Sequence, residues 1–158
     1  SDHLIVGSKA GGYSVNGTSG YVILGRWKAD HSCTIDTLGI EIAETNGTGR
    51  PLRLVIYPDS GGSPSGDALA YTGEITTTAV SGSEEMETAT NTAIAITSGT
   101  YYWVGYWCGY TGTNATCASS SGSNGAYYAQ AYHSTNTPPS ISGATVWGYQ
   151  VSGYALSQ

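Results

Sequence analysis

The sequence has little charge, and its charge is unevenly distributed. Charged residues make up 10% of the 158 positions, whereas about a quarter is usual in a soluble domain. No Asp, Glu, Lys or Arg follows Glu87, so residues 88–158 carry no formal charge. The net charge is −6, and the sequence has no basic cluster. This balance argues against nucleic acid and anionic membranes as partners.

Long apolar runs and the usual motifs of catalysis are also missing. No run approaches the ~20 apolar residues of a membrane-spanning helix. The chain has no Cys-x-x-Cys pair, its three histidines lie far apart, and no two carboxylates are marked as a pair. We therefore expect no catalytic residues, no metal and no cofactor, and predict that the protein is not an enzyme. Asp59 and Asp67 in "YPDSGGSPSGD" are a weak calcium candidate, because the same residues are typical of a turn.

The three cysteines and the start of the chain indicate an extracellular protein. Cys108 and Cys117 flank the short segment "CGYTGTNATC", which predicts a disulfide at the end of a hairpin in an oxidising compartment. Cys33 is then left as a buried small side chain or an intermolecular thiol. The start "SDHLIVG" has neither Met nor a signal peptide, as expected of a mature secreted chain. Three sequons offer candidate N-glycosylation sites, at Asn16, Asn46 and Asn114.

Glycine, serine, threonine and tyrosine are abundant, and hydrophobic residues alternate with period two. The segment "TIDTLGIEIAE" places Leu38, Ile40 and Ile42 on one face, and "PLRLVIYPD" places Leu52, Leu54 and Ile56 on one face. Turn sequences such as "NGTG" and "SSSGSNG" separate these segments. The segment "SGSEEMETAT" has the composition for one helical turn, although "ETATNT" reads as extended. The pattern predicts a single all-β domain, an antiparallel β-sandwich over residues 16–158, with residues 1–15 as an N-terminal arm or a first strand.

One part of the chain resembles a known module. The run "RLVIYPDSGGSPSGDALAYTGEIT", followed by "ITSGTYYWVGYW", is similar to a jelly-roll module found in carbohydrate-binding modules, phage tail and fibre proteins, and surface proteins of bacteria and archaea. The resemblance covers about residues 38–107, and "GYQVSGYAL" resembles its last strand. It implies a jelly-roll fold. It implies no particular site, because proteins with this module have different roles.

The stretch "YYWVGYWCGY", residues 101–110, contains six aromatic rings. As a strand it has Val104 on one face and Trp103 and Trp107 on the other. If the Val104 face points inward, the two tryptophans form an exposed platform for a sugar or for another protein; if the strand is turned over, both are core residues. The aromatic candidates for an interface or a glycan platform are Tyr101, Trp103, Trp107, Tyr110, Tyr127 and Trp147.

Two functions fit this pattern. The uncharged, aromatic second half favours an extracellular structural subunit that assembles with copies of itself into a filament, surface layer or appendage. In that case the N-terminal segment "HLIV" could pair with a neighbouring sheet. The alternative is a glycan-binding module or lectin that holds a polysaccharide on a Trp and Tyr platform.

Overall fold

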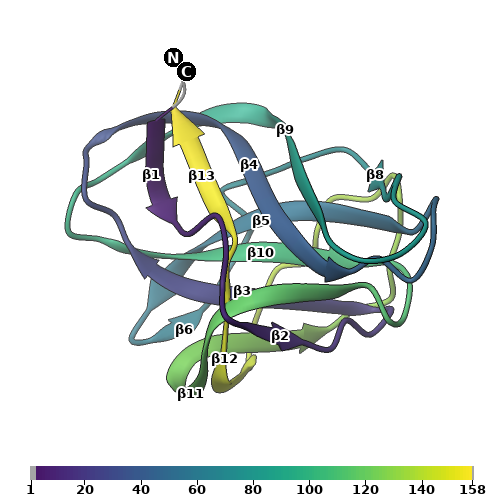
Figure 1. The fold of residues 1–158 in the computed structure, drawn as a ribbon. Coiled ribbons are helices and arrows are strands. Elements are labelled where there is room, and N and C mark those ends of the chain that lie inside the picture. Colours follow the sequence, from purple (N-terminus) through teal and green to yellow (C-terminus); the bar gives the residue numbers. More distant parts are fainter. Residues whose placement is uncertain (1–2, 158) are drawn as a thin grey trace.

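The computed structural model describes residues 3–157, which form thirteen β-strands and no helix (Figure 1). The strands are β1 (His3–Gly7), β2 (Tyr13–Val15), β3 (Tyr21–Lys28), β4 (Cys33–Glu44), β5 (Pro51–Ser60), β6 (Ser63–Pro64), β7 (Ala70–Tyr71), β8 (Ile75–Thr76), β9 (Glu84–Ile96), β10 (Tyr101–Cys108), β11 (Asn114–Ala129), β12 (Thr145–Val151) and β13 (Tyr154–Ser157). All pairings between them are antiparallel. The predicted all-β class is confirmed. Within the described part of the chain no helix is long and apolar enough to span a membrane.

The strands follow one main order in space, β1-β13-β4-β11-β3-β10-β5-β6, with the remaining five attached at its sides. β1 pairs with β13 of the same chain, with His3 opposite Ser157. The segment predicted as an arm or a first strand therefore contains two short strands, β1 and β2, that pair with β13 and β11 of the same chain. Ser1 and Asp2 of that segment lie outside the described residues.

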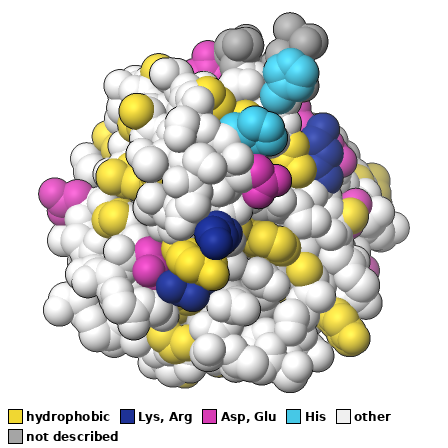
Figure 2. Space-filling model, turned by 90° about the vertical axis from the view of Figure 1, so that its left-hand side faces the viewer, with side chains coloured by type: hydrophobic (Ala, Val, Ile, Leu, Met, Phe, Trp, Pro, Cys, Tyr) yellow, Lys and Arg dark blue, Asp and Glu magenta, His cyan; other side chains and the backbone are white. Residues whose placement is uncertain are grey.

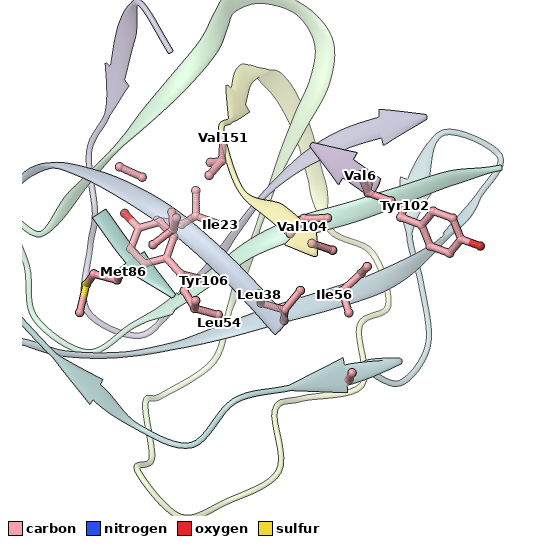
Figure 3. Packing of buried hydrophobic residues seen from close by; sticks show 14 of the residues in the cluster. Val6, Ile23, Leu38, Leu54, Ile56, Met86, Tyr102, Val104, Tyr106 and Val151 are labelled. Carbon is pink, nitrogen blue, oxygen red and sulfur yellow. The ribbon is translucent and has the colours of Figure 1, made fainter. Parts of the chain in front are cut away.

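The strands enclose a main core between two layers, an arrangement consistent with a β-sandwich (Figures 1 and 3). Leu38, Ile40 and Ile42 of β4 are fully buried, as the alternation predicted. Leu54 and Ile56 of β5 are buried in the same cluster. Each large aliphatic side chain buried in this way stabilises the fold by about 1.5–3 kcal/mol.

A second, smaller cluster lies on the opposite face of β3, β5 and β10. It contains Trp103 and Trp107 together with Tyr57, and Ile141 of the segment 130–144 packs on it. We call this segment, which has no strand of its own, the covering segment. As a result β10 is buried on both faces, although the sequence predicted one outward face.

The covering segment is held by side chains of the sheet that donate to its backbone carbonyls. Trp107 Nε1 donates to Gln130 O at 3.0 Å, and Tyr57 Oη donates to Pro139 O at 2.7 Å. The guanidinium of Arg53, which is buried, donates to carbonyl oxygens of His133 and Asn136 in the covering segment and to Thr72 O. These bonds satisfy buried donors that would otherwise destabilise the sheet.

Two local expectations were wrong. Residues 84–96 form the strand β9, paired with β4, so "SEEMETAT" contains no helical turn. The cysteines are free thiols, so the predicted bond between Cys108 and Cys117 is absent, and Cys33 is half-buried.

The missing disulfide has a topological cause. Cys108 ends β10, where it pairs with β3 and β5, and Cys117 lies in β11, where it pairs with β2 and β12, so the two strands do not pair with each other. The segment between them is therefore a crossing connection instead of a hairpin loop. Burial raises the pKa of the Cys108 thiol to about 11, and the thiol donates to Tyr110 O at 3.3 Å.

Candidate functional site: an aromatic groove

An exposed groove lined by aromatic rings lies over β3, β11 and β12. Its lining residues are Asn16, Thr18, Tyr21, Ile23, Tyr127 and Trp147, and its volume is about 210 Å³. We call it the aromatic groove. The volume is below the ~300–1,000 Å³ of sites that enclose drug-sized ligands. The groove therefore suits a small unit, such as one sugar ring or one side chain, held at the surface.

Strand register brings the groove residues together from distant parts of the sequence. Tyr127 of β11 lies opposite Ile23 of β3, and Tyr21 shares the face of Ile23 because side chains two residues apart point the same way. On the other side of β11, Gly125 lies opposite Trp147 of β12. Three neighbouring strands thus present one continuous row of rings.

The rings touch one another in series. The centroids of Tyr21 and Tyr127 are 5.9 Å apart, those of Tyr127 and Trp147 are 4.5 Å apart, and those of Trp147 and Tyr149 are 4.8 Å apart. Tilted and edge-to-face pairs at these distances are favourable, by about 0.5–1.5 kcal/mol each. Tyr21 and Trp147 also pack against the main core. The row is therefore fixed before any ligand arrives.

Two facing glycines allow β12 to lie close enough to form the groove. Gly25 of β3 and Gly125 of β11 are register partners. A Cβ on Gly125 would lie 2.0 Å from Tyr149 O, and a Cβ on Gly25 would lie 2.2 Å from Val151 O. Any side chain at either position would push β12 away from the sheet.

Two further hollows adjoin the aromatic groove. One, of about 190 Å³, shares Asn16 and Trp147 with it and adds Ser14 and Tyr149. The other, of about 280 Å³, shares Tyr21 and Tyr127 with it and adds Tyr128 and Thr145. Trp147 on one side and the tyrosine pair on the other separate three hollows in a row. This geometry suits an extended ligand.

The groove and its neighbours carry no ionisable acid or base apart from tyrosine hydroxyls. Among the described residues that line the three hollows there is no Asp, Glu, His, Lys, Arg or Cys. The described part of the chain also contains no cluster of three or more His, Cys, Asp or Glu side chains able to hold a metal ion. The arrangement can stack on a neutral ligand and can offer hydroxyl and amide groups to it.

The indole N–H of Trp147 has an unusual environment. It is enclosed, and it finds no hydrogen-bond acceptor among the described residues. An unpaired buried donor costs about 1–3 kcal/mol. The Trp147 ring is therefore held by packing on its neighbours and not by a bond at its nitrogen.

The structure separates the six predicted platform residues. Tyr127 and Trp147 lie in the aromatic groove. Trp103 and Trp107 are 0% and 1% exposed, so the prediction that they form an outward platform is wrong. They are buried because the covering segment packs on them, and the periodicity of the sequence could not reveal this.

Tyr101 and Tyr110 are exposed but not free. The guanidinium of Arg26 lies 3.7 Å from the ring centroid of Tyr101, and that of Arg50 lies 3.8 Å from that of Tyr110. Cation–π pairs of this kind cover one face of each ring. On the face drawn in Figure 2, Lys and Arg side chains lie directly beside hydrophobic ones, and most of the remaining surface is uncharged.

Asp59, one of the two carboxylates of the calcium candidate, is hydrogen-bonded to other side chains. Asp59 accepts hydrogen bonds from Arg26 Nε at 3.0 Å and from Trp103 Nε1 at 2.9 Å. Burial alone would raise the pKa of Asp59, but the bonds from Arg26 and Trp103 outweigh it and hold the pKa below its usual value. Asp59 is thus the carboxylate of a structural ion pair, and a calcium site at Asp59 and Asp67 stays a prediction.

Sequence reasoning missed Tyr21 and Tyr149, and it noted Asn16 as a sequon but not as part of a groove. A signal for Tyr149 was present, because it is two residues from Trp147 in a strand-like segment. Tyr21 gave no signal, since its ring contact is with Tyr127, more than a hundred residues away. Comparison with protein-family models and with curated proteins finds no match to this chain.

Proposed function

We propose that this chain is a non-enzymatic extracellular module that binds neutral polysaccharide through the aromatic groove. The main support is the arrangement of three aromatic side chains. Tyr21, Tyr127 and Trp147 contact one another in a row and line an uncharged hollow. The C–H faces of a pyranose ring stack on aromatic faces, and Asn16 and Thr18 at the rim supply partners for sugar hydroxyls. The absence of carboxylates and histidines from the described lining favours binding over hydrolysis, which needs a carboxylate pair.

The resemblance of residues 38–107 to jelly-roll modules agrees with this proposal, since some of those modules bind carbohydrate. The antiparallel fold is compatible with it. The jelly-roll connectivity itself stays a prediction, and so does the secreted location.

The test is binding of the purified chain to insoluble cellulose and chitin and to soluble xylan and mannan, followed by pull-down and by tryptophan fluorescence. Trp147→Ala should weaken binding of any positive polymer at least tenfold, or about 1.4 kcal/mol. Tyr101→Ala is the matched control, because Tyr101 is a surface ring away from the groove. Equal losses in both variants, or no binding to any polymer, would contradict the proposal.

Self-assembly is the second candidate, and one observation favours it. Tyr149, exposed on β12, contacts Trp147 of the groove, and Tyr13 is exposed on β2, which also flanks β11, so the groove lies within a larger neutral aromatic surface. A face of this kind is also suited to contact with a second copy. Electron microscopy with size-exclusion chromatography tests it: filaments or sheets that Tyr149→Asp abolishes would support assembly, and a monomer at high concentration would contradict it.

A further inference from the structure

The three sequons differ in how far their amide groups are bonded within the fold. Asn16 and Thr18 are both exposed, while Gly17 between them is buried. A Cβ on Gly17 would lie 1.8 Å from Thr113 O, so this residue faces the interior and directs its two neighbours outward. The acceptor amide and the threonine hydroxyl of this sequon are thus both open to solvent.

Asn46 and Thr48 of the second sequon are also exposed, but the Asn46 amide is bonded within the fold. Asn46 Nδ2 donates to Thr111 O at 3.0 Å, and Asn46 has a positive φ of 54°. An attached sugar would replace a donor hydrogen of that amide and would have to share the space near the turn. A glycan at this position would therefore lie next to a structural contact and compete with it for space.

The third sequon is the least accessible. Asn114 Oδ1 accepts a bond from Gly17 N at 2.8 Å, and Thr116, the third residue of this sequon, is buried. The Asn114 amide holds the loop that carries Asn16. A glycan there would be attached to a half-buried side chain whose oxygen already holds a loop.

Asn16 also lies at the rim of the aromatic groove. It lines both the central hollow and the adjoining hollow that contains Tyr149. A sugar linked to its amide nitrogen would begin within reach of Trp147, which lines the same two hollows. The occupant with the shortest path to this groove is a glycan carried by the chain itself.

We propose that Asn16 is the N-glycan acceptor of this chain, and that the first sugars of the attached glycan lie in the aromatic groove. The acceptor assignment rests on the geometry of the sequons alone. The second half rests on the proposed affinity of the groove for sugar. A glycosylated chain would then carry a ligand in cis that competes with external polysaccharide, so modification at Asn16 would regulate the site.

The acceptor is tested by expressing the full chain through the secretory pathway of yeast and mapping glycopeptides by mass spectrometry. We expect one glycan, at Asn16, which Asn16→Gln and Thr18→Ala both remove. Asn46→Gln and Asn114→Gln should leave its mass unchanged. A modified Asn46 or Asn114 in place of Asn16, or a secreted chain with no glycan, would overturn the assignment.

The position of the glycan is tested without any added polysaccharide. Limited oxidation by N-bromosuccinimide, read on peptides, should modify Trp147 at least threefold more slowly in the glycosylated chain than in Asn16→Gln. Trp27, half-buried outside the groove lining, is the internal reference. If Asn16→Gln is not secreted, enzymatic removal of the glycan from the wild-type protein supplies the comparison. Equal oxidation rates in both forms would overturn occupancy of the groove while leaving the acceptor assignment standing.

Failure of this inference is distinguishable from failure of the proposed function. The unglycosylated chain binding none of the four polymers would contradict the proposed function. Glycopeptide mapping would still decide the acceptor, and the oxidation rate would still decide the position of its glycan.

Discussion

The molecule contains two groups of aromatic side chains that are alike in composition and opposite in use. Under the covering segment, Trp103 and Trp107 are buried and their indole N–H groups donate to Asp59 and Gln130. In the aromatic groove, Trp147 keeps a ring face at the surface, and its N–H has no acceptor among the described residues. The first group has every indole donor satisfied within the fold, as a core requires.

An aromatic-rich strand therefore does not identify a binding surface by itself. What decides is whether another segment covers it. Residues 130–144 cover β10, whereas the edge where β12 meets β11 and β3 stays open.

Truncation of a tryptophan should separate the two groups most clearly. Trp107→Ala removes a fully buried side chain and its bond to Gln130, so it should lower the free energy of unfolding by about 3–5 kcal/mol. Trp147→Ala should cost about 1–2 kcal/mol, because the ring is half-exposed. Urea denaturation of both variants measures this, and equal losses would remove the distinction drawn between the groups.

The covering segment should become more mobile when the guanidinium of Arg53, which donates to its carbonyl groups, is removed. Arg53→Met keeps the volume of the side chain but leaves the carbonyls of Thr72, His133 and Asn136 without their donor. We expect a loss of about 2–3 kcal/mol. Hydrogen exchange should become faster at amides of residues 130–140 and stay unchanged in β4. Uniform acceleration across the chain would show that Arg53 supports the whole fold and not the covering segment in particular.

Acid should destabilise the fold by protonating Asp59, which accepts a hydrogen bond from the buried Trp103. Because the folded pKa of Asp59 lies below its usual value, its contribution is complete above the unfolded pKa, near 3.9, and is lost as the pH falls through the folded pKa. Asp59→Asn should lower stability by about 1.5 kcal/mol at pH 7 and flatten the acid limb of the stability curve. An unchanged slope below pH 4 would contradict this role for the ion pair with Arg26.

Thiol labelling should have the smallest effect on the fold. Cys33 is half-buried, whereas Cys108 and Cys117 are buried and burial raises the pKa of both thiols. Iodoacetamide at pH 8 should therefore modify Cys33 first, and the other two after unfolding in urea. Mass spectrometry counts the adducts. A product two hydrogens lighter, with Cys108 and Cys117 blocked, would restore the disulfide that the structure lacks.

The all-β class, and the inward faces of the strands with clear alternation, could be predicted from the sequence alone. Leu38, Ile40 and Ile42 are buried as predicted, because period-two burial is a local property of a strand with one face on a core. The sparse charge of the second half was likewise readable, and the described groove lining carries none.

Which aromatic rings are exposed, whether Cys108 and Cys117 lie on paired strands, and which sequon amides are bonded within the fold all depend on the tertiary structure. Trp103 is buried by residues that follow it by about thirty to forty positions, and Cys108 and Cys117 lie on strands that do not pair with each other. The groove needs Tyr21, Tyr127 and Trp147 from three strands. These outcomes depend on strand order, which arises from contacts between distant segments and leaves no periodic trace in the local sequence.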